Sequence, residues 1–214
     1  MIHIVDASNR RLYADQIEEH FRIRHSIYVE ERRWMELERP DGREVDQFDT
    51  EDAVYLLALK DGKVIGGSRL VPTLCPHLMS EVFPFLANIR GLQRGPDIVE
   101  WTRIFVVPEY RGRESTVLHS VLAGMLEYCL EQNFSAITVV METWWMPRFL
   151  ELGWEVKPLG LPTMIDGMSC IGTMISVTEE AWRNTLAFKR IAAPTLVDRR
   201  HGPSIIEERR TNHV

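Results

Sequence analysis

Two apolar segments joined by a tight turn place the strongest constraint on the fold. Ala53–Leu59 (AVYLLAL) has the length and composition of a buried strand, and Val64–Leu70 (VIGGSRL) follows it closely. Between them lies Asp61-Gly62, a dipeptide that favours a two-residue hairpin turn because both central residues of that turn need a positive φ. The chain is therefore expected to contain a β-hairpin, which must be buried within a larger sheet.

Helical and extended patterns alternate along the rest of the chain. A long helical pattern covers residues 9–34, and a short helix is expected to end before Gly153. Further strands are predicted at Val99–Val107, Ala136–Met141, Trp154–Lys157 and Cys170–Val177, and further helices at Ser80–Ile89, Thr116–Gln132 and Thr178–Arg190. This order predicts an α/β fold, a three-layer sandwich with a mixed central sheet. We expect one domain over residues 1–190 and a C-terminal tail over residues 191–214.

Composition and charge argue against several classes of protein. The 214 residues carry a formal net charge of −6, whereas a general nucleic-acid binder has a basic excess or a basic face. Asp6, Arg10, Arg11 and Asp15 interrupt the N-terminus, so no signal-peptide core is expected, and no apolar run approaches the roughly 20 residues that cross a bilayer. Three widely spaced cysteines fit reduced thiols. We predict a cytoplasmic protein with neither nucleic-acid nor membrane partners.

Charged side chains inside apolar segments are the next informative feature. Arg24 shares a helical face with Ile17, Arg69 lies in an apolar strand, and Glu100 and Arg103 lie in VEWTRIFV. Buried charges are expensive unless they pair or face a ligand. Strict alternation places Glu100 and Arg103 on opposite faces of the strand, unless a bulge brings both to one cleft. A structural arginine–carboxylate network and a functional site both stay open, as does a solvated helix-edge position for Arg24.

A polar loop, GREVDQFDTED, carries Asp46 and Asp49 just before the first buried strand. Such a loop is usually a solvated turn, but two acidic groups near a cleft would instead hold a cation. The spacing lacks the glycine and the terminal glutamate of a calcium loop, and no histidine or cysteine cluster has metal-ligand or triad spacing. Trp34, Trp144 and Trp145 have the ordinary explanation of core packing, although Trp34 closes the first helix, where it would stack on a planar ligand. No metal and no cofactor are predicted.

The order and spacing of these residues carry a more specific signal than any one of them. FRIRHSIYVEERRW, VDQFD, GGSRLVPT, SEVFP and EWTRIFV together resemble the signature of the autoinducer synthases, the acyl-homoserine lactone synthases. The resemblance is strong over about residues 10 to 107 and weakens toward residue 177. It rests on nine positions, namely Arg24, Tyr28, Trp34, Asp46, Asp49, Arg69, Phe83, Glu100 and Arg103. It implies a fold related to the GCN5-type N-acetyltransferases, with residues 1–190 as the synthase domain.

The resemblance also implies a reaction for quorum sensing. The enzyme transfers an acyl group from a thioester to the amine of S-adenosylmethionine, and the product then closes to a lactone and releases methylthioadenosine. Glu100 would be the base, and backbone N–H groups near Arg103 would stabilise the oxyanion. The implied catalytic residues are Glu100, Arg103, Asp46 and Arg69, and the implied contacts of S-adenosylmethionine are Arg24, Tyr28, Trp34, Asp49, Phe83 and Arg103. The main alternative is an N-acetyltransferase of the same fold acting on another amine.

Three departures from the family pattern bear on the acyl donor. Tyr28 stands where the family usually has phenylalanine. The turn VVPEYRGRES resembles the acyltransferase pyrophosphate loop, but Glu114 and Ser115 replace its small residues. The strand that often carries a threonine facing a 3-oxo chain reads VVMETWW, which favours a short, branched or aromatic acyl group from coenzyme A over one from acyl carrier protein. The expected acyl pocket consists of Met141, Glu142, Trp144, Trp145 and Met146.

Overall fold

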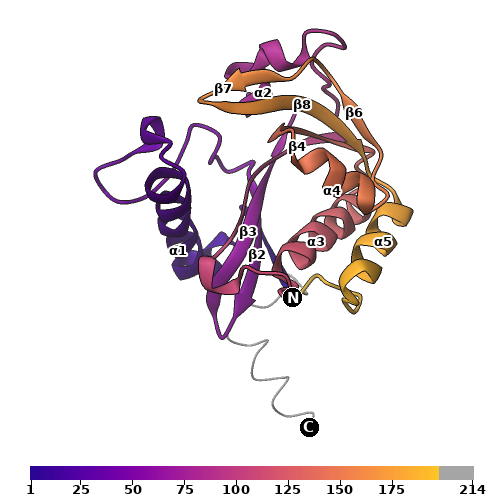
Figure 1. Cartoon of the computed structure of the whole chain (residues 1–214). Helices are drawn as coiled ribbons and strands as arrows, with labels where there is room; N and C mark the ends of the chain where they lie inside the picture. Colours follow the sequence, from indigo (N-terminus) through magenta and orange to yellow (C-terminus); the bar gives the residue numbers. More distant parts are fainter. Residues whose placement is uncertain (198–214) are drawn as a thin grey trace. The chain divides into compact units, whose positions relative to one another are not determined.

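The computed structural model describes residues 1–197 and has the predicted mixed α/β fold (Figure 1). Its strands follow the order β1-β2-β3-β4-β5-β8-β6, with β7 on β8, in one mixed eight-stranded sheet. The strands are β1 (Ile2–Val5), β2 (Val54–Lys60), β3 (Lys63–Pro72), β4 (Ile98–Val106), β5 (Ala136–Glu142), β6 (Val156–Pro158), β7 (Thr163–Ile165) and β8 (Met168–Ser176). The α-helices are α1 (Ala14–Arg24), α2 (Leu78–Glu81), α3 (Val117–Glu131), α4 (Trp145–Glu151) and α5 (Glu179–Lys189).

The chain forms two compact units, and β3, β4 and α3 contribute residues to both. The first unit comprises Met1–Arg69, Arg103–Gly124 and the described residues from Pro194 onward, and the second comprises Leu70–Thr102 and Met125–Ala193. Each unit has its own buried cluster, so each is described by itself.

The first unit contains the predicted hairpin and the long N-terminal helix. Asp61 and Gly62 have φ values of 51° and 72°, as the turn between β2 and β3 requires. Helix α1 continues without a break into a π-helix, η2 (His25–Glu31), in which the N–H of Arg32 still reaches the carbonyl of Ile27 at 3.0 Å. Their apolar side packs with β2 in a core of which the buried members are Val5, Tyr13, Ile17, Ile27, Tyr28, Ala53, Tyr55, Leu57, Val64 and Phe105.

The second unit is built on β5. Strand β5 pairs parallel with β4 through Ile98–Glu100 and antiparallel with β8 over its full length. A stack of aromatic rings fills its core: Phe149 lies 4.7 Å from Trp154, with an angle of 5° between the rings, and Trp101 contacts both. Gly153 ends α4 with a φ of 74°, which confirms its predicted role as the helix cap.

The sequence-based prediction missed two strands, and residues 195–197 of the predicted tail pair with the sheet. Strand β1 pairs antiparallel with β2, and β7 pairs with β8 across Asp166-Gly167. The N–H of Ile2 donates to the carbonyl of Thr195, and that of Val197 donates to the carbonyl of Ile2, so residues 195–197 lie along β1. The rest of the predicted tail lies outside the described residues. Within residues 1–197, no helix combines the length and the apolar character that a membrane span needs.

Candidate functional site

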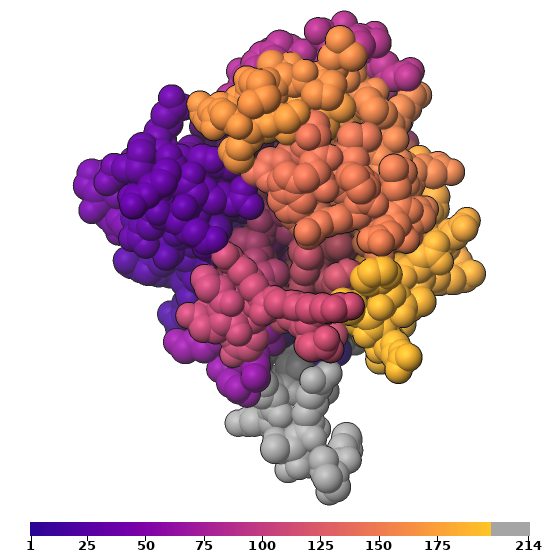
Figure 2. Space-filling view, viewed as in Figure 1, coloured from indigo at the N-terminus to yellow at the C-terminus, as the bar shows by residue number. Residues whose placement is uncertain are grey.

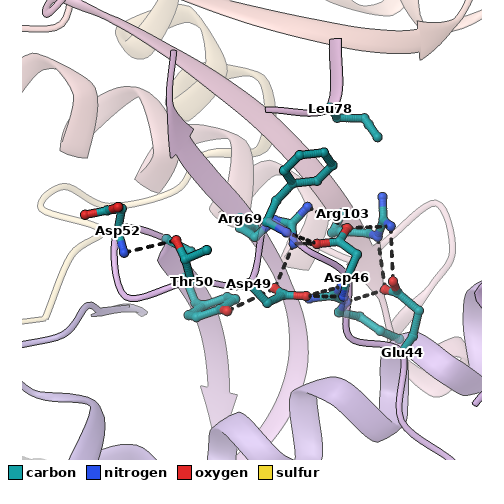
Figure 3. A network of polar contacts seen from close by, with 12 residues as sticks. Glu44, Asp46, Asp49, Thr50, Asp52, Arg69, Leu78 and Arg103 are labelled. Carbon is teal, nitrogen blue, oxygen red and sulfur yellow. Dashed lines mark hydrogen bonds and ion pairs between the residues drawn. The ribbon is translucent and has the colours of Figure 1, made fainter. Parts of the chain in front are cut away.

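Six charged side chains of the first unit form one closed network (Figure 3). The α1 helix supplies one of them, the loop before β2 supplies three, and β3 and β4 supply one each. Three are arginines and three are carboxylates, so the network is neutral as a whole. Its members are Arg24, Glu44, Asp46, Asp49, Arg69 and Arg103.

Asp49 holds the inner end of the network. The guanidinium of Arg24 binds it bidentately, with Nη1–Oδ1 at 2.8 Å and Nη2–Oδ2 at 2.9 Å. Arg69 approaches the same carboxylate at 2.7 Å, and the hydroxyl of Tyr55 donates to it at 2.9 Å. The N–H of Asp46 also donates to Asp49, at 2.9 Å. The acidic loop is therefore folded around its own carboxylate, and the solvated-turn interpretation does not hold for this residue.

Glu44 and Asp46 connect this end to Arg103. Glu44 accepts from Arg24 Nε at 2.5 Å and from Arg103 Nε and Nη2 at 3.0 and 3.1 Å. Asp46 accepts a bidentate pair from Arg69 at 2.6 and 2.9 Å and a further bond from Arg103 Nη2 at 2.8 Å. Charge-assisted and bidentate bonds of this kind fix geometry as well as charge. Each arginine thus holds two carboxylates.

Exposure changes along the network. The side chains of Arg24, Glu44, Asp49 and Arg69 are at most 1% exposed, whereas those of Asp46 and Arg103 are each 7% exposed. The network therefore has a closed inner end and a slightly open outer end.

The pKa shifts agree with this balance of charge. Burial alone raises the pKa of Glu44, but the guanidiniums of Arg103 and Arg24 lower it to about 2. For Asp49, burial also acts to raise the pKa, and Arg24 with Arg69 outweighs it, so the carboxyl is more acidic than usual. Burial lowers and the facing carboxylates raise the pKa of Arg24, with a net increase. All three groups are therefore charged at neutral pH.

A strained backbone position lies at the outer end. Arg103 has a φ of 54° within β4, in the left-handed region that an L-residue in a strand rarely adopts. Next to it, the hydroxyl of Tyr28 donates to the carbonyl of Ile104 at 2.7 Å, and the Arg103 guanidinium lies 5.6 Å from the Tyr28 ring. Trp34 stacks on Tyr28, with the ring centroids 5.2 Å apart and an angle of 12° between the rings. The positive φ at Arg103 is a local departure from regular strand geometry within β4.

Glu100 and Phe83 belong to the second unit. Glu100 is fully buried, and its two carboxylate oxygens accept from the N–H groups of Leu78 and Met79, each at 2.7 Å. Phe83 follows α2 and is half-buried, 6.1 Å from Phe85. The predicted catalytic Glu100 therefore contacts backbone N–H groups at the start of a helix.

The predicted acyl-pocket residues lie at the end of β5 and on α4. Trp144 stacks on Trp145 at 4.6 Å, and its Nε1 donates to the carboxylate of Glu142. Trp144 is 44% exposed, and α4 lies at the surface of its unit (Figure 2). Met141 is buried, and Met146 is partly buried. A wall for the acyl chain built from these residues stays a prediction.

A cavity of about 390 Å³ lies beside the turn that resembles a pyrophosphate loop. Lys60 and Arg111 line it together with Glu109, Glu114 and the first residues of α3. The guanidinium of Arg111 is held by two bonds to Glu31, at 2.5 and 2.9 Å. Among the described residues no cluster of histidine, cysteine or acidic side chains is arranged to hold a metal ion.

Sequence reasoning missed Glu44, which is 1% exposed and bonds to two arginines. Its position in a polar loop made it look solvated. The numbers of charged residues could have indicated it. Arg24, Arg69 and Arg103 are three buried cations, so two aspartates leave one positive charge unbalanced and a third carboxylate is needed.

Comparisons with known proteins decide the family. The model of the autoinducer synthase family matches residues 8–185. This chain belongs to the autoinducer synthase family. An isovaleryl-homoserine lactone synthase of Bradyrhizobium diazoefficiens is 45% identical over 212 residues, which cover 99% of this chain and 94% of that protein. An acyl-homoserine-lactone synthase of Acinetobacter nosocomialis is 31% identical over 72% of this chain and 88% of its own length. The sequence-based prediction of an acyltransferase of this family is thus confirmed.

Solved structures agree with the fold. The CoA-dependent acyl-homoserine lactone synthase BjaI, in complex with SAM and isopentyl-CoA, matches with a TM-score of 0.89 at 42% identity and covers 100% of this chain and 99% of its own. The CoA-dependent synthase MesI matches with a TM-score of 0.86 at 46% identity over 92% of this chain and 100% of its own. An N-acetyltransferase from Lactobacillus plantarum matches with a TM-score of 0.52 at 19% identity, which confirms the predicted relation to the N-acetyltransferase fold.

Proposed function

We propose that this synthase N-acylates S-adenosylmethionine with a short, branched acyl group from coenzyme A and releases an N-acyl-homoserine lactone. Similarity to a relative named for an isovaleryl product, and to a synthase crystallised with isopentyl-CoA, supports this donor and chain. A cytoplasmic location stays a prediction.

One observation carries the binding proposal: the charged network presents one carboxylate and one guanidinium at its open end. S-adenosylmethionine has a sulfonium, an ammonium and a carboxylate, so it needs groups of both signs. Arg103 offers donors to the carboxylate, and Asp46 complements the cationic groups. Arg24, Arg69 and Asp49 hold the side chains of Arg103 and Asp46 in place. Trp34 and Tyr28 line the part of the site that takes the adenine ring. Because these inner groups are buried and paired, they fix the positions of Arg103 and Asp46 and do not contact the substrate themselves.

The reaction has two steps, and each must balance. In the first, the amine of S-adenosylmethionine loses its proton and attacks the thioester carbonyl; the C–N bond forms, the C–S bond breaks, and the thiolate leaves and takes up a proton. An oxyanion forms on the way, and backbone N–H groups near Arg103 are proposed to stabilise it. In the second step the carboxylate attacks the γ-carbon, the lactone closes, and methylthioadenosine leaves as a neutral sulfide.

The chain preference is proposed to come from β5 and α4. In this proposal Met141, Trp145 and Met146 form the wall of the acyl site and exclude a long chain, and Glu142, which accepts from the indole of Trp144, offers no hydroxyl to a 3-oxo group. A compact, branched chain fills such a pocket without an unpaired polar atom.

The test is a product assay with the purified protein. S-adenosylmethionine is incubated with isovaleryl-CoA, straight-chain and 3-oxo acyl-CoAs, and isovaleryl-acyl carrier protein, and products are identified by mass spectrometry. We expect isovaleryl-homoserine lactone and methylthioadenosine in equal amounts, with isovaleryl-CoA as the best donor. A preference for the carrier protein would refute the donor assignment, and acylation of another amine without methylthioadenosine would favour a general N-acetyltransferase.

The Arg103→Lys variant tests the site within this assay. Lysine keeps the charge but loses the planar fork that reaches Glu44 and Asp46 together. We expect kcat/KM to fall at least about tenfold, in line with the loss of one charge-assisted bond. Arg22→Lys, at an exposed arginine paired with Glu18, is the matched control and should leave kcat/KM unchanged.

A further inference from the structure

Within the first unit, the π-helix η2 is attached to β4 at two points. In the middle of η2, the hydroxyl of Tyr28 donates to the carbonyl of Ile104 at 2.7 Å. At the last residue of η2, Glu31 accepts a bidentate pair from the guanidinium of Arg111, at 2.5 and 2.9 Å. The third nitrogen of this guanidinium, Nε, donates to the carbonyl of Val106 at 2.7 Å. Arg111 therefore joins the last residue of η2 to the last residue of β4.

Local chemistry does not account for the end of η2. π-Helical geometry is rare and occurs mostly as single turns, so a run of seven residues needs support from the surrounding structure. Glu31 ends this run, and a carboxylate is unfavourable at the C-terminal end of a helix, where free carbonyl groups carry partial negative charge. The guanidinium of Arg111 offsets both negative charges. The ion pair thus compensates a placement that the helix by itself disfavours.

The position of Trp34 depends on where η2 ends. Trp34 follows Glu31 by three residues, its N–H donates to the carbonyl of Tyr28 at 2.9 Å, and its ring stacks on the Tyr28 ring. The connection turns at Arg33, whose φ of 61° lies in the left-handed region. A short, strained connection leaves Trp34 little freedom to stay in place when the end of η2 moves.

The strained position of Arg103 depends on the same attachment. Arg103 has a φ of 54°, and the two β4 carbonyl groups that η2 and Arg111 hold, those of Ile104 and Val106, come directly after it. A residue in a sparsely populated conformation persists only where the surrounding contacts over-determine it. The two bonds to β4 are such contacts, so one attachment serves both Trp34 and Arg103.

We propose that Glu31 and Arg111 are positioning residues, whose ion pair fixes η2 against β4 and so sets the positions of Trp34 and Arg103 for S-adenosylmethionine. The inference rests on the proposed function, because that function assigns Trp34 and Arg103 to this substrate. Neither Glu31 nor Arg111 contacts the substrate in this scheme. Their side chains are 47% and 38% exposed, so the ion pair contributes little to stability, and its loss acts mainly on substrate binding.

Two conservative variants break the ion pair from opposite sides. Glu31→Gln keeps the shape of the side chain but removes its charge, and the amide has one oxygen for two donors. Arg111→Lys keeps the charge but loses the planar fork that reaches Glu31 and Val106 together. Arg183→Lys is the matched control, because it makes the same exchange at an exposed arginine of α5 paired with Glu179.

We expect both variants to raise the KM for S-adenosylmethionine about three- to fivefold, which corresponds to the upper part of the range for an exposed ion pair. The kcat and the KM for isovaleryl-CoA should stay within about twofold of those of Arg183→Lys. The melting temperature should stay within about 3 °C of that control. Glu31→Arg places two guanidiniums face to face and should raise the KM for S-adenosylmethionine further, and adding Arg111→Glu should bring it back toward the wild-type value.

A direct role of Arg111 in binding the donor is the main rival, since Arg111 also lines the cavity beside the turn after β4. In that case Arg111→Lys raises the KM for isovaleryl-CoA, and Glu31→Gln, which frees the guanidinium, lowers it. This pattern would overturn the proposal. An unchanged KM for S-adenosylmethionine in both variants would also overturn it, and so would additive effects of Glu31→Arg and Arg111→Glu, because a restored ion pair must rescue its own loss.

If the wild-type protein makes no lactone at all, the proposed function fails, and the attachment is then tested by hydrogen exchange. The N–H of Trp34 donates to the carbonyl of Tyr28, so Arg111→Lys should accelerate exchange at the Trp34 amide relative to Arg183→Lys. Exchange at the rate of the control would mean that the ion pair does not position Trp34.

Discussion

Replacing Glu44 with glutamine is the sharpest test of the buried network. The change keeps the volume of the side chain and removes its charge, so three arginines then face two carboxylates. Glu44 accepts from Arg24 at 2.5 Å and from Arg103 at 3.0 and 3.1 Å, and an amide can offer only one oxygen to both. Removing one partner of a buried ion pair leaves an uncompensated charge, which is strongly destabilising.

The magnitude follows from the pKa of Glu44. The two guanidiniums hold it at about 2, against an ordinary value of 4.5. At about 1.4 kcal/mol per pH unit, the difference corresponds to about 3 kcal/mol of stability at neutral pH. Because the folded pKa is lowered, this contribution is fully present above about pH 4.5 and disappears as the pH falls toward 2. Glu44→Gln should therefore lower the free energy of unfolding by about 3 kcal/mol at pH 7, and the gap should narrow below pH 4.5.

The assay is urea unfolding of wild type and variant between pH 7 and pH 3, followed by tryptophan fluorescence. Glu18→Gln is the control: it removes an exposed carboxylate 2.7 Å from Arg22 and should change stability by less than about 0.5 kcal/mol. A gap under about 1 kcal/mol at pH 7 would refute the reasoning, and so would a gap of 3 kcal/mol that stays constant down to pH 3.

Three further predictions concern single buried side chains. Tyr28→Phe removes the hydroxyl that donates to Ile104 and should lower the free energy of unfolding by about 1 kcal/mol, measured by urea unfolding, with Trp emission unchanged. Burial holds the pKa of His20 well below 6.5, so this residue is neutral when folded and protonates on unfolding; wild-type stability should fall below pH 6.5, and His20→Phe should flatten that dependence. Thr185→Val removes the acceptor of the Trp154 indole at 2.8 Å and should lower the melting temperature by a few degrees in calorimetry.

Much of the fold was predictable because local chemistry and tertiary structure agree. Asp61-Gly62 needs positive φ values, and the chain has them at the predicted turn. Strand β1 was missed because IHIV is short and no turn residue marks its start. Strand β7 was missed because its three residues are mostly exposed, so no buried face produces a period of two. In both cases the strand forms because it pairs with another strand, β2 or β8, and the short segment itself carries no pattern that predicts this pairing.

The site was predictable only in part, for a related reason. Buried arginines such as Arg24 and Arg69 signal that partners exist, but sequence does not say which carboxylates they are. Asp46 and Asp49 were identified through the family resemblance, whereas Glu44 required the folded loop. Glu100 shows the limit most clearly: the family resemblance marks its position as important, but the sequence does not show that its carboxylate accepts from the N–H groups of Leu78 and Met79.

The distribution of exposure explains why such a network persists in this fold. Buried ion pairs contribute little to stability beyond what packed apolar side chains would provide, so stability is a weak reason to retain six of them. Arg103 sits at a φ of 54°, a conformation that costs on the order of 1 to 3 kcal/mol, and Glu44 with Tyr28 holds it there. The closed end at Arg24 thus keeps a strained, partly open guanidinium and Asp46 in one arrangement before any substrate arrives. If S-adenosylmethionine binds there as proposed, no reorganisation of these two side chains is needed, and this preorganisation is the network's proposed contribution to the reaction.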